Sequence, residues 1–174
     1  MIAFATIQEL SAYVNRTIAQ DDPTAELALS LASDAVRAYC RQDISQATTT
    51  EVVQGPGSSL LMLSQTPVTE VSEVTVDGTV IPETAYATTA FGALYRTRGH
   101  WPGVFSSIAV TYTHGWSEIP GPVKAATLSV AARIYDSPAG VKQETIGAYS
   151  VTYTNGVPSL LDSETASLDP YRLA

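Results

Sequence analysis

The sequence predicts an α+β protein in which a small helical body carries an antiparallel β insert. Apolar residues recur at helical spacing before Cys40 and again after Pro120. The stretch between them is rich in β-branched residues and in turn-forming Gly, Pro and Asp, which is typical of short strands. We expect a single domain over residues 1–157, with the helical body at 1–45 and 120–137, the β insert at 46–119 and a strand region at 141–157, followed by an extended C-terminal arm at 158–174.

Two helices near the N-terminus begin at recognisable caps. Thr6 and Glu9 have the spacing of a capping box, in which each side chain accepts a hydrogen bond from the other residue's backbone N–H. Asp22 is a favourable N-cap, and Pro23 suits the first helical position because its missing N–H would be unpaired there anyway. The short link between the two helices predicts a helical hairpin. The expected helices end near Ala19 and Arg41.

The middle of the chain contains strands separated by turns. Asp77-Gly78 predicts a two-residue hairpin turn because both residue types tolerate positive φ. Gly55-Pro56-Gly57 predicts a further hairpin turn, and Phe91-Gly92 another. The expected strands are Thr48 to Gln54, Leu60 to Leu63, Val71 to Val76, Thr79 to Ile81, Tyr86 to Thr89, Leu94 to Arg96, Ser107 to His114 and, broken by Gly147, Ile146 to Thr154.

A third helix is expected from Val123 to about Tyr135. Its side chains are unusually small, and small residues allow another helix to approach closely, either within one subunit or between subunits. We take Ala125, Ser129 and Ala132 as candidate subunit-interface residues on this helix. Beyond it, a short helix is expected around Ser159 to Leu168, and the tail either docks as a terminal element or orders on a partner.

Composition and charge exclude several classes of protein. The net charge is −8, with 17 acidic against 9 basic residues, which argues against a surface built to neutralise phosphates. An acidic wall around a DNA passage remains compatible with this charge, because such a wall repels the duplex. Charged residues make up only 15% of the chain, which indicates either burial in an assembly or a surface rich in small polar residues. The N-terminus lacks the features of a signal peptide, and no apolar run is long enough to span a membrane.

The sequence contains no motif for catalysis, metal binding or a cofactor. His100 and His114 share no metal-binding spacing, and Cys40 is the only cysteine, so an intrachain disulfide is impossible. Gly55-Pro56-Gly57 lacks the Gly-Lys-Ser/Thr ending of a phosphate-binding loop, and no Gly-x-Ser-x-Gly elbow occurs. We therefore expect no enzyme activity, no metal and no cofactor.

One local cluster combines basic and aromatic residues. Such clusters stack on nucleic acid, solvate a loop tip, or meet an acidic patch on a neighbouring subunit, and the negative net charge disfavours nucleic acid. The cluster consists of Tyr95, Arg96, Arg98, His100 and Trp101.

The order of these elements, more than any one of them, carries a resemblance. Pro67-Val68-Thr69-Glu70-Val71 precedes Val74-Thr75-Val76-Asp77-Gly78, and Val110-Thr111-Tyr112-Thr113-His114-Gly115 leads to the late helix. Leu168-Asp169-Pro170-Tyr171-Arg172 closes the chain. This series resembles the head-to-tail connector (adaptor) proteins of long-tailed bacteriophages and gene transfer agents, particularly those with a β insert, and the resemblance spans nearly the whole chain.

The resemblance implies a structural role in the neck of a virion. Adaptors of this kind form a ring, commonly of twelve subunits, that joins the portal to the tail and extends the DNA channel without sequence-specific DNA binding. The implied partners are other copies of the chain, the portal protein and a downstream stopper protein. Because Leu168, Tyr171 and Arg172 match the closing motif, we take them as candidate portal contacts. We also expect that a chain ending after Leu160 stays folded but no longer joins the portal.

Other functions remain open from the sequence. The nearest alternative is another neck or tail component of the same class, such as a stopper or tail-completion protein, although the helical opening favours the adaptor. A different class is a β-rich module that binds carbohydrate or a host surface, with Tyr95, Trp101 and Trp116 exposed together as a platform.

Overall fold

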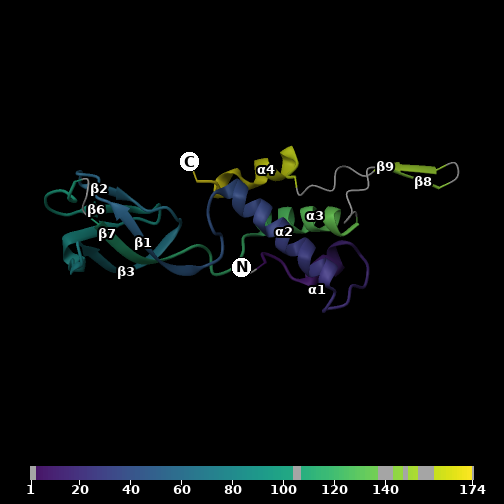
Figure 1. The fold of residues 1–174 in the computed structure, drawn as a ribbon, viewed down its shortest axis with the longest axis horizontal. Coiled ribbons are helices and arrows are strands. Elements are labelled where there is room, and N and C mark those ends of the chain that lie inside the picture. The colour runs from purple at the N-terminus through teal and green to yellow at the C-terminus, as the bar shows by residue number, and fades with distance from the viewer. Residues whose placement is uncertain (1–2, 104–106, 137–142, 147–148, 153–158, 174) are drawn as a thin grey trace. The chain divides into compact units, whose positions relative to one another are not determined.

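The computed structural model describes residues 3–103, 107–136, 143–146, 149–152 and 159–173. The chain divides into two compact units (Figure 1). The helical unit combines Met1–Arg41 with Ile119–Ala174, and the β unit is Gln42–Glu118. The β unit is therefore an insertion in the chain of the helical unit. Helices together with antiparallel sheets confirm the predicted α+β class.

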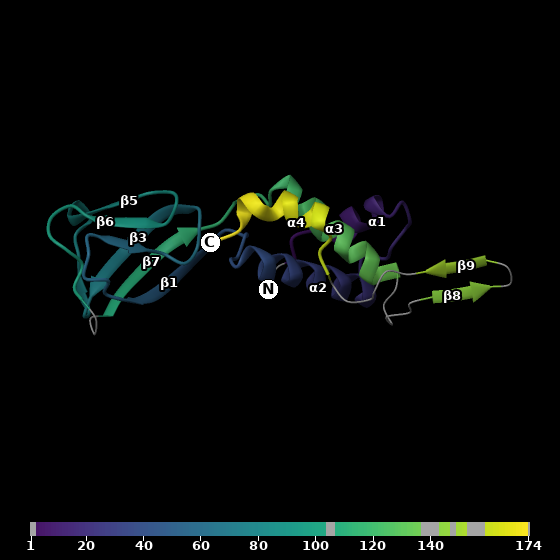
Figure 2. The ribbon, with the colours of Figure 1, turned by 90° about the horizontal axis from the view of Figure 1, so that it is seen from above.

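Among the described residues, four α-helices form the helical unit, and α2 and α3 are central because each of them contacts the other three. Figure 2 shows α1, α2 and α3 beside one another, and each of the three contacts the other two. The core that they share is built largely from small apolar side chains, including Ala28, Ala32 and Ala131, which lets the helices pack closely. The helices are α1 (Ile7–Tyr13), α2 (Pro23–Cys40), α3 (Gly121–Asp136) and α4 (Asp162–Leu168), and the short 3-10 helix η2 (Asp169–Tyr171) follows α4.

Both predicted helix caps are present, and each also joins two helices. The Thr6 hydroxyl accepts from the Glu9 N–H at 3.2 Å, and the Glu9 carboxylate accepts from Lys124 of α3 at 2.7 Å. Asp22 accepts from the second and third residues of α2, and its other oxygen accepts from the Tyr135 hydroxyl at 3.0 Å. A carboxylate at a helix N-terminus is thus used twice, once for the local cap and once for a tertiary contact.

The first helix is shorter than the sequence predicts. It ends at Tyr13 instead of Ala19, because Asn15 adopts a left-handed conformation with φ 52°. The Ser11 hydroxyl then fastens the loop, since it donates to the Arg16 carbonyl at 2.6 Å and accepts from the Ile18 N–H at 3.3 Å.

The β unit consists of two antiparallel sheets that share one core. Residues 107–114 alternate as predicted, with Ile108, Val110 and Tyr112 fully buried. These side chains pack with Leu61 and Leu94 of the smaller sheet. The larger sheet has the order β1 (Ala47–Gln54), β7 (Ser107–His114), β3 (Val68–Val76), β4 (Thr79–Val80), and the smaller one the order β2 (Leu60–Met62), β6 (Ala93–Arg96), β5 (Tyr86–Thr88), with the short 3-10 helix η1 (Glu83–Ala85) before β5.

The prediction of a hairpin turn at Gly55-Pro56-Gly57 is wrong. β1 pairs with β7 and β2 pairs with β6, so this segment crosses from one sheet to the other. It is fastened to the chain around Pro102, whose carbonyl accepts from the Gly57 N–H at 3.0 Å. A Cβ at Gly55 would lie only 2.1 Å from the same carbonyl oxygen, which explains the glycine.

The two ends of the β unit are joined to each other. Ser45 and Trp116 form a parallel bridge, in which the Trp116 N–H donates to Ile44 and its carbonyl accepts from Gln46, both at 2.9 Å. Gly115 makes this approach possible, because its φ is +83° and a Cβ there would lie 2.5 Å from the Ser45 carbonyl oxygen. The chain therefore enters and leaves the β unit at one point.

Two predictions for the C-terminal third need correction. The strand expected at Ile146 to Thr154 is instead a pair of short strands, β8 (Gln143–Ile146) and β9 (Tyr149–Thr152), which pair with each other. The remainder of that prediction lies outside the described residues. The tail is also not an extended arm over 159–173, because α4 and η2 pack against the helical unit and Leu168 is fully buried there.

Candidate functional site

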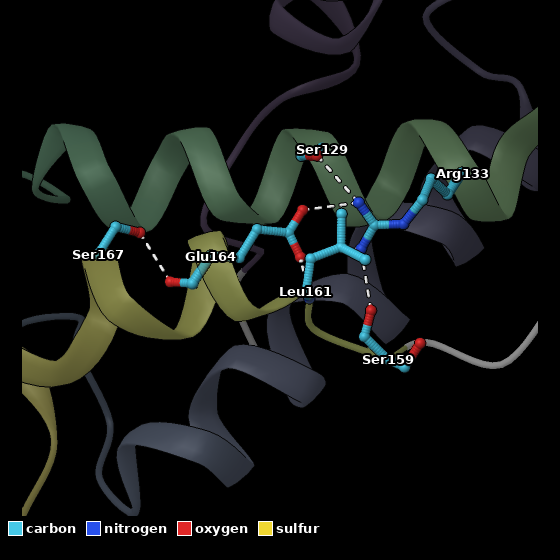
Figure 3. A network of polar contacts seen from close by, with 6 residues as sticks. All are labelled: Ser129, Arg133, Ser159, Leu161, Glu164 and Ser167. Atoms are coloured by element: carbon cyan, nitrogen blue, oxygen red, sulfur yellow. Dashed lines mark hydrogen bonds and ion pairs between the residues drawn. The ribbon is translucent and has the colours of Figure 1, made fainter. Parts of the chain in front are cut away.

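The C-terminal element, residues 159–173, is held to α3 by a partly buried ion pair (Figure 3). The guanidinium of Arg133 donates two hydrogen bonds to the Glu164 carboxylate, at 2.6 and 2.9 Å. It also donates to the Ser129 hydroxyl at 3.0 Å and to the Ser159 carbonyl at 2.9 Å. One arginine thus links the start of the element and the first turn of α4 to α3, in the fork geometry that makes Arg–carboxylate pairs specific.

Glu164 is buried in its charged form. Burial by itself would raise the pKa of the carboxyl, but the hydrogen bonds from Arg133 and from the Leu161 N–H favour the carboxylate. The net pKa of Glu164 is lowered from its ordinary value of 4.5. At neutral pH the pair therefore stays ionised, and its side chains are 30% and 8% exposed for Arg133 and Glu164.

A second set of contacts fixes the far end of the element. Leu168 lies in the interior with no exposed surface. The Asp169 carboxylate accepts from the Tyr39 hydroxyl, and the Leu173 N–H donates to the Cys40 carbonyl at 3.0 Å. The Arg172 guanidinium lies 5.2 Å from the centre of the Tyr39 ring, a cation–π distance. The C-terminal end of α2 and the closing motif are therefore one packed structure.

The three candidate portal residues fall into different environments. Leu168 is buried in the subunit's own core, Tyr171 is partly buried, and Arg172 is exposed. Of the three, Arg172 is therefore accessible to solvent and Tyr171 is partly so. Leu168 acts from inside by holding α4 in place.

The three candidate interface residues on α3 also differ in exposure. Ser129 contacts Arg133 beneath α4, and Ala132 packs on the core of the helical unit. Ala125 alone of the three is exposed. The small side chains at positions 129 and 132 therefore serve contacts inside the subunit.

The basic–aromatic cluster on the β unit is partly internal. Trp101 is 1% exposed and donates from its indole N–H to the Leu94 carbonyl at 3.1 Å. The Arg96 guanidinium lies 5.1 Å from the Trp101 ring centre, and Arg96 and Arg98 line a hollow of about 580 Å³. Because Trp101 is buried, it is not available for an exposed aromatic platform with Tyr95 and Trp116.

The histidines do not form a reactive site with one another. His114 is buried and its Nε2 contacts the Thr49 hydroxyl at 3.2 Å, whereas His100 is exposed. Burial is the main reason that the pKa of His114 is lowered. In the part of the chain that the structure describes, no group of three metal-ligating side chains converges, and no helix is long and apolar enough to cross a membrane.

Sequence reasoning missed Arg133 and Glu164, which lie on different helices and carry the docking of the C-terminal element. A local signal existed, because Glu164 stands at the third position of α4, where glutamate reaches back to the N-terminal N–H groups. The residue before the helix is Leu161 instead of Ser or Thr, so the usual pattern is incomplete.

Solved structures from gene transfer agent particles share this fold over nearly the whole chain. One is the neck of an empty gene transfer agent particle with C6 symmetry, which has a TM-score of 0.66 and 15% identity and covers 98% of this chain and 90% of that chain. Another is the neck of a native particle with C12 symmetry, with a TM-score of 0.65, 14% identity, and coverage of 97% of this chain and 88% of that chain. A third is the virion of a native particle, with a TM-score of 0.68, 13% identity, and coverage of 98% of this chain and 90% of that chain.

The chain belongs to the head completion protein family, whose model matches residues 3–172. The resemblance to head-to-tail connectors drawn from the sequence is confirmed by this membership. No curated protein matches the chain.

Proposed function

We propose that this protein is a structural, non-enzymatic subunit of the virion neck, which forms a ring that joins the portal to the tail and extends the DNA channel. The observation that carries the proposal is the fold shared with gene transfer agent necks over 97–98% of the chain. Those necks were resolved with C6 and C12 symmetry, which supports a symmetric oligomer as the working form. The net charge of −8 suits a channel through which DNA slides without binding.

The C-terminal element is the proposed contact with the portal. Its closing motif places Arg172 at the surface, while Leu168 and the Arg133–Glu164 pair fix its position. A pre-positioned contact loses less conformational entropy on binding than a free tail does. On this proposal, Tyr171 and Arg172 make the contact and Leu168 supports it from within.

Native mass spectrometry of the purified chain with the portal protein from the same genome tests the proposal. We expect copies of the chain to load on the portal in a fixed stoichiometric number, twelve if the ring matches the symmetry of the native neck. A chain that stays monomeric and ignores the portal would overturn the assignment. The charge-removing variant Arg172→Ala keeps Leu168 and the Arg133–Glu164 pair but loses the contact with Tyr39. It should weaken loading, whereas Arg98→Ala on the β unit should not.

The alternative within the same class is a later neck component, such as a stopper or tail-completion protein. The family name, head completion protein, supports a position at the head without fixing the neighbour. The same mixture separates the two, because a stopper binds only after an adaptor ring is present. Loading on a bare portal favours the adaptor, and loading only on a portal that already carries another neck protein favours the stopper.

A further inference from the structure

Both cations of the β unit line one hollow. Arg96 and Arg98 border this hollow of about 580 Å³ together with Thr84, Ala85 and Thr97. The β unit contains no other lysine or arginine. Among the residues that the structure describes, no acidic side chain lines the hollow. The hollow is therefore positively charged and has no anion of its own.

The guanidinium of Arg96 is largely withdrawn from water without being paired. Its Nε and Nη1 atoms are buried and have no hydrogen-bond partner in the described part of the chain, whereas Nη2 is not among the buried atoms. Arginines of the helical unit are used differently, since Arg133 binds Glu164 and Arg37 binds Asp34. Burying a charge without a partner is costly, and buried polar groups of native proteins are normally hydrogen-bonded. This unpaired guanidinium indicates a site for an anion.

The cation is held in a fixed position at the hollow. The guanidinium of Arg96 lies 5.1 Å from the centre of the Trp101 ring, and Trp101 is fixed in turn by the bond from its indole N–H to the Leu94 carbonyl. The next residue, Thr97, donates from its N–H to the Ala85 carbonyl at 3.0 Å, which joins the two sides of the hollow. A pre-positioned cation loses little conformational entropy when it binds an anion.

The charge of the surrounding unit distinguishes between possible anions. The two arginines stand in a unit with seven acidic residues, which disfavours a polyanion such as DNA because its phosphates are closely and evenly spaced. A single carboxylate on a peptide can enter the hollow without bringing a row of further charges with it. The acidic residues of the unit are Asp43, Glu51, Glu70, Glu73, Asp77, Glu83 and Glu118.

We propose that the hollow lined by Arg96 and Arg98 is a carboxylate-binding site that takes an acidic segment of another protein. An aspartate or glutamate of that segment accepts a charge-assisted hydrogen bond from the Arg96 guanidinium, and the exposed Arg98 adds a second positive charge. The site goes beyond the proposed function, because it lies on the β unit and needs neither the portal nor a ring.

An NMR titration of the full chain tests the site. The probe is a hexaglutamate peptide at low and constant ionic strength, because salt screens exposed charges. In the wild type, we expect saturable shifts of the Trp101 indole N–H and Arg96 Nε–H resonances. The affinity followed at Trp101 should fall about tenfold or more in Arg96→Gln and in Arg98→Gln, since a hydrogen bond to a charged group contributes on that order.

Two controls separate a site from general attraction between opposite charges. Arg41→Gln removes the same charge from an exposed position of the helical unit, and it should bind the peptide like the wild type. Thermal melting checks that each variant is folded. Because Arg98 is exposed, Arg98→Gln tests the site even if Arg96→Gln disturbs the packing on Trp101.

Each contrary result overturns the proposal. These results are the absence of saturable shifts in the wild type, equal affinity in the wild type and Arg98→Gln, and an equal loss in Arg41→Gln. An oligothymidylate of the same net charge as the peptide tests the rival anion, and its binding at Trp101 as tightly as the peptide would also overturn the carboxylate assignment. None of these outcomes bears on loading on the portal, so this inference and the proposed function fail separately.

Discussion

Glu164 shows how one buried residue controls a whole segment. Its carboxylate receives two bonds from Arg133 and one from the backbone N–H that opens α4. Leaving a charged, half-buried partner unpaired costs about 1–3 kcal/mol. The residue therefore contributes more to docking than an exposed surface pair, which is worth about 0–1 kcal/mol.

We expect Glu164→Gln to lower the free energy of unfolding by about 1–3 kcal/mol at neutral pH, because Arg133 loses its anionic partner. The pKa of Glu164 is lowered, so its contribution is complete above the ordinary value of 4.5 and is lost as the pH falls through the folded-state pKa. The difference between wild type and variant should accordingly shrink in acid. Urea unfolding at pH 7 and below pH 4 measures this, with the exposed Glu70→Gln as the control. An equal difference at both pH values would contradict it.

Residues whose partners are close in sequence could be predicted, and residues with distant partners could not. The caps at Thr6 and Asp22 depend on groups three residues away and are present as predicted. The tertiary bonds of Asp22 and Glu164 join residues 113 and 31 positions apart, which no local pattern encodes. The closing motif could be recognised from the sequence, but the burial of Leu168 and the exposure of Arg172 depend on how α4 docks.

At the level of elements, the sequence predicted where helices and strands occur better than it predicted which strands pair with one another. The alternation in 107–114 predicts which side chains of β7 face the core. The division of the strands into two sheets was not predicted. Gly55-Pro56-Gly57 indicates a change of chain direction, but it does not indicate which strands the flanking strands β1 and β2 pair with. The end of α1 was missed because Asn15 tolerates both helical and left-handed conformations.

Gly115 should be the least replaceable glycine at the base of the β unit. Gly115→Ala meets both a positive φ and a backbone oxygen at 2.5 Å, whereas Gly99, with φ +75°, has nothing within 4 Å of the added carbon. The backbone strain of an alanine at positive φ alone costs about 1–3 kcal/mol. We expect thermal unfolding to show a clearly larger loss for Gly115→Ala than for Gly99→Ala, and equal losses would show that the close approach at Ser45 is unimportant.

The docked form of α4 changes what a truncation should do. Ending the chain after Leu160 removes Leu168 from the core and leaves Arg133 without its carboxylate. Burying a leucine contributes about 1.5–3 kcal/mol, so we now expect the shortened chain to be destabilised as well as deficient in portal binding. Circular dichroism melting of chains ending at positions 160 and 173 measures the effect. A truncated chain with an unchanged melting temperature would show that α4 adds nothing to the subunit's stability.

For the whole molecule, the separate core of the β unit predicts independent folding. Residues 42–118 bury their own cluster, which includes Trp101, Tyr112 and Leu94, and their ends pair through Ser45 and Trp116. This fragment should fold alone, with a cooperative thermal transition and dispersed amide resonances. A matched fragment with Val110→Asp, which places a charge in the core, should not. A wild-type fragment that lacks a cooperative transition would show that the core depends on the helical unit.

The pairing of Ser45 with Trp116 has a consequence for how such proteins change over evolutionary time. The two ends of the inserted β unit lie next to each other. The helical unit therefore has to accommodate only a short gap between Arg41 and Ile119, whatever the inserted segment contains. Because loop closure cost depends weakly on the length enclosed, such a module can be enlarged, shrunk or exchanged at small thermodynamic expense to its host. The helical unit then keeps its own packing while the inserted module diversifies.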